Sequence, residues 1–138
     1  MRASVSGNPG PGGWGVVLEE GGETRQWSGS EAETTNNRME LRAAIEALRV
    51  LPEGTPVQLF TSSDYVYQGA TSWISGWRRR NWVKQSGQPV ANADLWRELD
   101  GLARERTLQW VNAKGKGEDM PLGLVEAARL AADAREVS

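Results

Sequence analysis

Any metal ion bound by this chain would have to be held by oxygen atoms. The 138 residues include neither cysteine nor histidine, so thiolate and imidazole ligands are excluded. A hard divalent cation held by several carboxylates is the remaining type of metal site. The 18 aspartate and glutamate residues of the chain supply the candidate ligands for such a site.

A second segment is suited to binding phosphate groups. Residues 73–84 read WISGWRRRNWVK, with the cations Arg78, Arg79, Arg80 and Lys84 set among tryptophans. Clustered cations with aromatic residues are typical of nucleic-acid interfaces. The alternative is a solvated helix face, which many charge runs form. Because the net charge of the chain is -2, any attraction for nucleic acid would be local to this segment.

Three further motifs stand out in the sequence. GNPGPGGWG occupies residues 7–15, TTNNRMEL residues 34–41, and GQPVANADLW residues 87–96, after the tryptophan-rich segment. In this order and spacing they are similar to the type 1 ribonuclease H family. The resemblance implies an α/β ribonuclease H-like fold, with a mixed β-sheet flanked by helices. It also implies a family that hydrolyses the RNA strand of an RNA/DNA hybrid with two magnesium ions.

The resemblance places four acidic metal ligands, and this chain has an acid at one of those positions. Glu40 matches the second ligand. Arg2 stands at the first position, Ser62 at the third, and Leu124 or Val125 at the fourth. We therefore expect a degenerate active site without a metal cofactor, and nuclease activity that is lost or severely reduced. The protein would then be a pseudoenzyme that binds hybrid.

Two alternatives to this hypothesis stay open. In the first, the protein is an active hybrid endoribonuclease with a rebuilt site for a single Mg²⁺ or Mn²⁺ ion, and Glu126 reaches the fourth position by a two-residue insertion. The residues that would rebuild the site are Glu40, Asp64, Glu118, Asp119 or Glu126. Against this, Lys114 replaces the family's loop histidine and is a poor proton shuttle near neutral pH. In the second, the fold is a structural or assembly subunit. Glu40 is expected in the first turn of its helix, and a simpler interpretation is that it only complements the helix dipole there or pairs with Arg2.

The resemblance also implies a surface that binds RNA/DNA hybrid. The residues at its phosphate pocket are Asn8, Thr35 and Arg38. The uncharged donors expected at the minor groove of the hybrid are Asn36, Asn37 and Gln68. The residues expected along the DNA strand are Trp73, Arg78, Arg79, Arg80 and Lys84. Asp64 departs from a glutamine contact of the family, so that contact is not expected here.

Residue patterns predict the elements that position these side chains. Apolar residues at helical spacing from Leu41 to Leu48 predict a helix with Thr35 or Asn36 as its N-cap. Asp64 is expected to cap the next helix. Two more helices are predicted over residues 93–104 and 122–134, and strands over residues 14–20, 23–28, 57–61 and 107–111.

Glycines and tryptophans outside the expected contacts have simpler interpretations. Gly7, Gly10, Gly12 and Gly13 are expected to form a tight loop next to the substrate backbone. We expect three further tryptophans of these motifs to pack in the interior rather than to contact a ligand. They are Trp77, Trp82 and Trp96.

Length and composition predict one soluble, cytoplasmic domain over residues 1–138, with no membrane segment. Only six residues precede Gly7, so the central first strand of the family's sheet is expected to be truncated. A shortened central strand would expose the backbone groups of its neighbours. Open strand edges favour association, so copies of this chain are expected to form a homo-oligomer through these edges.

Overall fold

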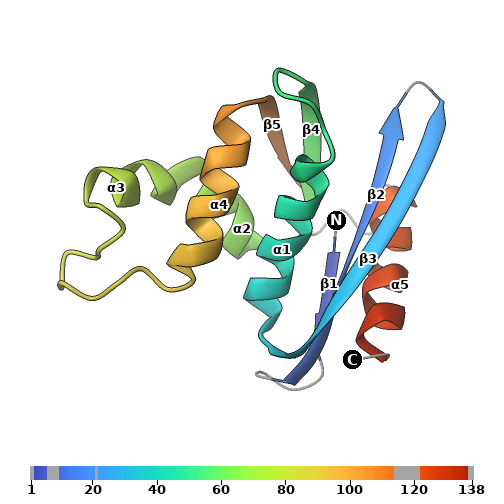
Figure 1. Ribbon diagram of the computed structural model, residues 1–138, viewed down its shortest axis with the longest axis horizontal. Helices are drawn as coiled ribbons and strands as arrows, with labels where there is room; N and C mark the ends of the chain where they lie inside the picture. The colour runs from blue at the N-terminus through green and yellow to red at the C-terminus, as the bar shows by residue number, and fades with distance from the viewer. Residues whose placement is uncertain (1, 6–9, 21, 114–121, 137–138) are drawn as a thin grey trace.

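The computed structural model describes residues 2–5, 10–20, 22–113 and 122–136. Three antiparallel strands come first, and helices and strands alternate after them (Figure 1). The strands are β1 (Arg2–Val5), β2 (Gly10–Glu20), β3 (Glu23–Thr34), β4 (Pro56–Thr61) and β5 (Thr107–Asn112). The helices are α1 (Asn36–Arg49), α2 (Asp64–Gln68), the π-helical turn η1 (Gly69–Trp73), α3 (Ile74–Arg79), α4 (Ala93–Arg104) and α5 (Leu122–Glu136).

The strands form two small sheets. In the first, β1 pairs antiparallel with β2, and β2 pairs antiparallel with β3, in the order β1-β2-β3. In the second, β4 and β5 are parallel, with Thr61 opposite Asn112 at their carboxyl ends. The predicted mixed α/β fold is confirmed. The truncated first strand is present as the four residues of β1, and within the described residues β1 pairs with β2 but not with β4.

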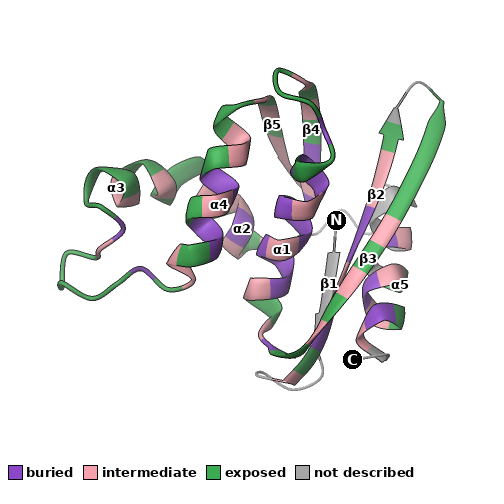
Figure 2. Ribbon diagram, in the orientation of Figure 1, coloured by how far each residue is buried: buried purple, intermediate pink, exposed green. Residues whose placement is uncertain are grey.

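Helices cover both faces of the β1-β2-β3 sheet. Helix α1 contacts β1 and β2 on one face, and α5 contacts all three strands on the other (Figure 1). Helix α4 packs against α1, and the core lies where α1 meets the sheet and α4 (Figure 2). Most of helix α1 is buried, shown in purple in Figure 2. Helix α3 and the loop after it are mostly exposed and project beside α4.

Helix α1 begins where its sequence provides a cap. The Thr35 hydroxyl accepts a hydrogen bond from the backbone N–H of Arg38 at 3.2 Å, and Thr35 is therefore the N-cap. Leu41, Ile45 and Leu48 are fully buried, as their helical spacing predicts. The prediction that Asp64 caps the next helix is wrong. Ser63 is the N-cap of α2, because its hydroxyl accepts from the N–H of Val66.

Glycines allow α5 to pack closely on β2. A Cβ at Gly13 would overlap the carbonyl oxygen of Ala131, and a Cβ at Gly15 would overlap that of Ala127. The expectation that Gly10, Gly12 and Gly13 form a loop is wrong, because all three lie within β2. At Gly13, close helix packing rather than a loop requires the absence of a side chain.

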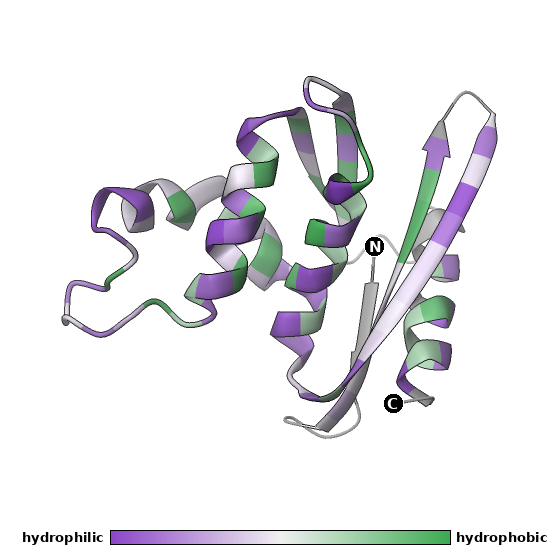
Figure 3. Ribbon diagram, viewed as in Figure 1, coloured by the Kyte–Doolittle hydropathy of each residue, from purple (hydrophilic) through white to green (hydrophobic). Residues whose placement is uncertain are grey.

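Polar side chains dominate the outer elements. In Figure 3 the α3 region and the loop after it are largely hydrophilic, whereas apolar residues of β2 and α1 face the interior. None of the helices in the described ranges is both long and apolar enough to cross a membrane.

A glycine also decides how α2 meets α4. The indole ring of Trp96, which is fully buried, lies directly over Gly69, and a Cβ at Gly69 would overlap that ring. The backbone of Gly69 is helical, with φ -61°, so its lack of a side chain serves packing rather than a special backbone conformation.

Substitution of Gly69 should therefore destabilise the protein through overpacking alone. We expect Gly69→Ala to lower the free energy of unfolding by about 1–3 kcal/mol, measured by chemical denaturation. The matched control is Gly101→Ala in α4, where a Cβ meets no atom within 4 Å. This control should gain about 0.5–1 kcal/mol from helix propensity. An unchanged stability of Gly69→Ala would mean that Trp96 can move aside.

Candidate functional site

The N-terminus of α1 presents several of the predicted contact residues together. Asn36 and Asn37 are exposed in the first turn, and Thr35 caps it. Arg38 extends toward α4, where its guanidinium donates two hydrogen bonds to the Asp94 carboxylate, at 2.9 and 3.1 Å. The phosphate-pocket residues Thr35 and Arg38 are thus adjacent. Asn8, the third predicted member of that pocket, lies outside the described residues.

Arg38 belongs to a hydrogen-bonded chain that reaches the interior. Its guanidinium also donates to the Asn92 side-chain oxygen at 3.2 Å. The Asn92 amide donates to the Tyr65 hydroxyl at 3.1 Å, which accepts a second bond from the Trp96 indole at 2.9 Å. These hydrogen bonds connect α1, α2 and the start of α4, so the three elements hold the Arg38 side chain in one orientation.

The pairing with Asp94 keeps both groups charged. The hydrogen bond from Arg38 lowers the pKa of the Asp94 carboxyl, and the same bond raises the pKa of the Arg38 guanidinium. Because the folded-state pKa of Asp94 is lowered, the stability from this pair is present near neutral pH and is lost as the pH falls through that pKa. The Asp94 side chain is 66% exposed, so the contribution is at most about 1 kcal/mol.

Glu40 lies deeper than the sequence predicts. Helix α1 begins at Asn36, which places Glu40 in its second turn, and the first turn contains no acidic residue. The expected placement of Glu40 in the first turn is therefore wrong, because the Thr35 cap starts the helix earlier. Glu40 is 5% exposed, among the few buried charged residues of the described chain. Burial at this depth weakens the interpretation that Glu40 only complements the helix dipole.

The carboxyl ends of β4 and β5 form the neighbouring part of the site. Thr61 ends β4 fully buried, and its hydroxyl accepts from the N–H of Ser63 at 3.0 Å. Ser62 follows half-buried, and Asp64 is exposed at the start of α2. The side-chain amide of Asn112, at the end of β5, donates to the Asp64 carboxylate at 3.2 Å. The oxygens at this strand end are thus mainly hydroxyl and amide groups.

The described residues do not fit a pair of divalent ions. Such ions need a cluster of carboxylates, since hard cations take six or more oxygen ligands. No group of three or more acidic side chains suited to a metal ion occurs in ranges 2–5, 10–20, 22–113 and 122–136. Glu126, the candidate for the fourth ligand, makes an ion pair with Arg129 within α5. That pairing lowers the pKa of the Glu126 carboxyl.

Several predicted site residues are only partly described. Arg2 begins β1, opposite Gly15, and Leu124 lies within α5, but the side chains of both are outside the described part. Lys114, Glu118 and Asp119 fall in residues 114–121, which are outside it as well. The ligand positions at which side chains are described are therefore those of Glu40 and Ser62.

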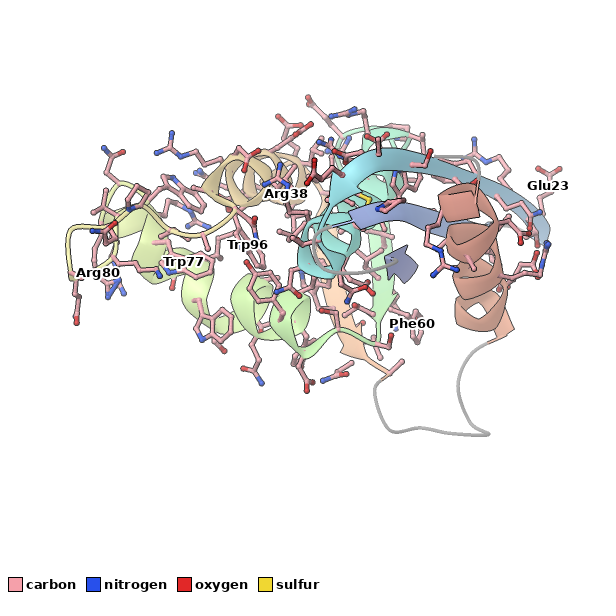
Figure 4. The ribbon with its side chains drawn as sticks, turned by 90° about the horizontal axis from the view of Figure 1, so that it is seen from below. Glu23, Arg38, Phe60, Trp77, Arg80 and Trp96 are labelled. Carbon is pink, nitrogen blue, oxygen red and sulfur yellow. The ribbon has the colours of Figure 1, made fainter. Side chains whose placement is uncertain are left out.

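The three consecutive arginines of α3 and its C-cap have different surroundings. Arg78 points to α4, where Nε and Nη2 donate to the two Asp100 carboxylate oxygens at 3.0 and 2.7 Å. The Asp100 side chain is largely buried, so this bidentate ion pair ties α3 to the core. Arg79 and Arg80 are exposed, as is Lys84 in the loop that follows. Arg80 lies at the opposite end of the molecule from Glu23 (Figure 4).

Four of the seven tryptophans form one connected aromatic cluster with Tyr65: Trp73, Trp77, Trp82 and Trp96. Trp96 is fully buried and Trp82 nearly so, which confirms that these two pack in the interior. Trp77 lies between Arg80 and Trp96 (Figure 4), with ring centroids 5.3 Å from Trp96 and 6.4 Å from Trp82. Trp73 is the exception, since it is 42% exposed at the edge of the cluster. Gln68, at the end of α2, is also exposed.

The family model for RNase H matches residues 2–136, which is nearly the whole chain. The chain belongs to the ribonuclease H family. The ribonuclease H of Erythrobacter litoralis is 49% identical over 136 residues, covering 97% of this chain and 92% of that protein. The ribonuclease H of Marinobacter nauticus is 52% identical over 112 residues, covering 81% of this chain and 76% of its own length.

Solved ribonucleases H share the fold. LC9-RNase H1, described as a type 1 RNase H with the type 2 active-site motif, superposes with a TM-score of 0.80 at 31% identity. The match covers 98% of this ribonuclease H-like chain and 69% of LC9-RNase H1. LC11-RNase H1 in complex with RNA/DNA hybrid superposes with a TM-score of 0.68 at 22% identity, covering 98% of this chain and 93% of its own.

Sequence reasoning missed the acidic and polar partners of the arginines. Asn92 and Asp94 bind Arg38, and Asp100 binds Arg78, across 54, 56 and 22 positions of the chain. A signal was available in the motif of residues 87–96, whose Asn92, Ala93 and Asp94 span the start of α4. Polar residues just before a helix usually cap it, but the Asn92 side chain makes no cap hydrogen bond to α4.

Proposed function

We propose that this ribonuclease H-like domain binds RNA/DNA hybrid and that its hydrolytic activity is lost or severely reduced. The observation that carries the proposal is a contrast between two neighbouring regions. Neutral hydrogen-bond donors and an arginine gather at the start of α1, while Glu40 stands without an acidic cluster among the described residues. The residues suited to binding nucleic acid are thus more complete than the carboxylates needed to cut it.

The contacts in this proposal come from the start of α1, from α2, and from η1, α3 and the loop after α3. Thr35, Asn36 and Asn37 at the start of α1 offer donors suited to phosphate oxygens and to the edges and 2′-hydroxyls of a hybrid minor groove. Gln68 would add a donor from α2. Arg79, Arg80 and Lys84 supply positive charge to the DNA strand, and Trp73 supplies an apolar surface beside them. The solved relative LC11-RNase H1 supports the proposal, because it was determined with RNA/DNA hybrid bound.

Arg38 would serve this surface in competition with Asp94. In the free protein, the exposed Asp94 carboxylate forms an ion pair with the Arg38 guanidinium. A phosphate beside Thr35 would have to share or replace that carboxylate. The network through Asn92 and Tyr65 would keep Arg38 oriented while the exchange takes place.

An active endoribonuclease remains the second candidate. Relatives with 49% and 52% identity are named ribonuclease H, and Asp64 places one exposed carboxylate at the strand end next to Ser62. In this alternative Glu40 and Asp64 would hold one Mg²⁺ or Mn²⁺. The hydrogen bond from Asn112 to Asp64 would have to yield to the ion.

Hybrid binding is expected to weaken steeply with salt. The slope of log K against log salt should be about -0.9 for each phosphate neutralised on a B-form duplex, and of similar size on a hybrid. We expect Arg79→Gln/Arg80→Gln to make this slope less negative by up to about 2, measured by fluorescence anisotropy from about 50 to 300 mM salt. Arg25→Gln/Arg104→Gln, which removes two exposed cations from β3 and α4, is the charge-matched control. Equal slopes for the two variants would assign the α3 arginines to a solvated face.

Self-association through open strand edges is a further part of the proposal. Among the described strands, β1 pairs with β2 and β4 pairs with β5, so one edge of β1 and one edge of β4 have no strand beside them. Such edges template pairing between copies. Light scattering from about 1 to 100 µM protein should show a mass that rises with concentration. A constant monomer mass would contradict association.

A further inference from the structure

A hollow lies along η1 and α3. Its volume is about 310 Å³, at the lower end of the range for small-ligand sites. Residues from η1, α3 and its C-cap line it: Ser72, Trp73, Ser75, Trp77, Arg79 and Arg80. The lining thus combines two indole rings, two guanidinium groups and two hydroxyls.

The aromatic side of the hollow is held in place before any ligand arrives. Trp73 is 42% exposed, the most accessible tryptophan of the cluster, so part of its ring is open to a ligand. Tyr65 contacts the ring edge-on with centroids 6.2 Å apart, and Trp77 contacts it at 5.8 Å. A ring fixed by two aromatic neighbours loses little conformational entropy when a flat partner stacks on it.

The cationic side of the hollow is available for an anion. In the described chain, neither Arg79 nor Arg80 lies within ion-pair distance of an acidic side chain, whereas Arg78 is bound by Asp100 on the other side of α3. The Arg80 guanidinium reaches back over Gly76, where an added Cβ would be 3.2 Å from Nη1. Helix α3 therefore directs one arginine to the core and leaves two for the hollow.

We infer that this hollow binds an unpaired nucleotide of a single-stranded segment that extends from the hybrid. The base would stack on Trp73, its phosphate would accept hydrogen bonds from Arg79 and Arg80, and Ser72 and Ser75 would contact base edges. The inference rests on the proposed hybrid binding, which would bring such a segment to the hollow. A base inside a duplex has both faces covered by its neighbours, so an exposed ring beside cations favours an unstacked base.

Blunt and extended hybrids distinguish this inference from the proposed function. The affinity of one hybrid duplex would be compared with that of the same duplex carrying a four-nucleotide dT extension on the DNA strand at either end, and a dT oligonucleotide alone would be measured beside them. One stacked base is expected to raise the affinity roughly 5- to 100-fold over the blunt hybrid for at least one end. An extension of abasic sites, which keeps the phosphates, should lose most of this gain.

Variants in the hollow identify the residues responsible. Trp73→Ala should abolish the preference for the extension and Trp73→Phe should retain part of it, where the preference is the ratio of the affinities of one variant for extended and for blunt hybrid. Arg79→Gln/Arg80→Gln, at exposed positions, tests the hollow without disturbing the aromatic cluster and should also remove the preference. Arg25→Gln on β3 should keep it.

Each outcome has one interpretation. A preference that is absent, that survives Trp73→Ala and Arg79→Gln/Arg80→Gln, or that abasic extensions reproduce would overturn the inference. If blunt hybrid fails to bind while the dT oligonucleotide binds in a Trp73-dependent manner, the proposed hybrid binding fails and the single-strand site stands. If none of the nucleic acids binds, both fail.

Discussion

Labelled RNA/DNA hybrid incubated with excess protein and magnesium is expected to remain uncut. Two-ion hydrolysis needs carboxylates that hold both ions near the scissile phosphate, so that one activates water and the other stabilises the leaving oxygen. At the position where the resemblance implies the third ligand this chain has Ser62, whose neutral hydroxyl would be a weak ligand beside a carboxylate. Glu40 alone would have to hold the metal.

The residue at the first ligand position adds a penalty of its own. A guanidinium at Arg2, about 4 Å from a divalent ion, would be repelled by about 8 kcal/mol at an effective dielectric of about 20. By the usual conversion, that energy corresponds to roughly a 10⁶-fold loss of metal affinity. A single carboxylate at Glu40 is not expected to offset it.

Denaturing electrophoresis of the labelled strand measures the result in magnesium and in manganese. Cleavage at defined sites that disappears in Glu40→Ala would contradict the loss of activity, because a contaminating nuclease would not depend on Glu40. The variant Arg2→Asp/Ser62→Asp returns two carboxylates to the expected positions. Metal-dependent cleavage by this variant alone would assign the loss to those two residues.

Among single substitutions of charged residues, Arg106→Ala is expected to cause the largest loss of stability. Arg106 is only 5% exposed, and its guanidinium donates to the backbone carbonyls of Leu51 and Leu102. These carbonyls lie just after α1 and within the last turns of α4, where helix backbones lack internal partners. Removing the donor would leave them without these charge-assisted bonds, at a cost of about 3 kcal/mol.

Chemical denaturation measures this loss against a neighbouring arginine. Arg104→Ala removes the same charge from an exposed position in the last turn of α4, and should change stability by about 0.5 kcal/mol or less. Arg106→Lys should recover only part of the loss, because an ammonium lacks the planar fork that reaches two carbonyls. Equal stabilities of the Arg106→Ala and Arg104→Ala variants would show that water replaces the guanidinium.

Local patterns predicted most of the helices and strands. The predicted bounds of α4, residues 93–104, agree with Ala93–Arg104, and the helical spacing from Leu41 to Leu48 gave the buried face of α1. These features depend on short-range periodicity. The strands β2 and β3 extend further than predicted, because their glycine-rich and polar residues pair across the hairpin without apolar alternation.

Features that depend on distant neighbours were not predicted. The ion pairs of Arg38 and Arg78 form only when α4 is in place, so no local pattern indicates that these cations already have partners. The role of Gly13 likewise depends on α5, which arrives at the end of the chain. The cap of α2 was misplaced by one residue because Ser63 and Asp64 are both good cap residues.

The most direct test of binding without cleavage follows one labelled hybrid in one reaction. Protein and hybrid are mixed in magnesium, and equal samples are run on a native gel for binding and on a denaturing gel for strand length. We predict a shifted complex that persists for hours with a full-length RNA strand, and that weakens as salt is raised. A complex whose RNA strand is cut at defined sites in the parent but not in Glu40→Ala would contradict the account, as would the absence of any complex at low salt.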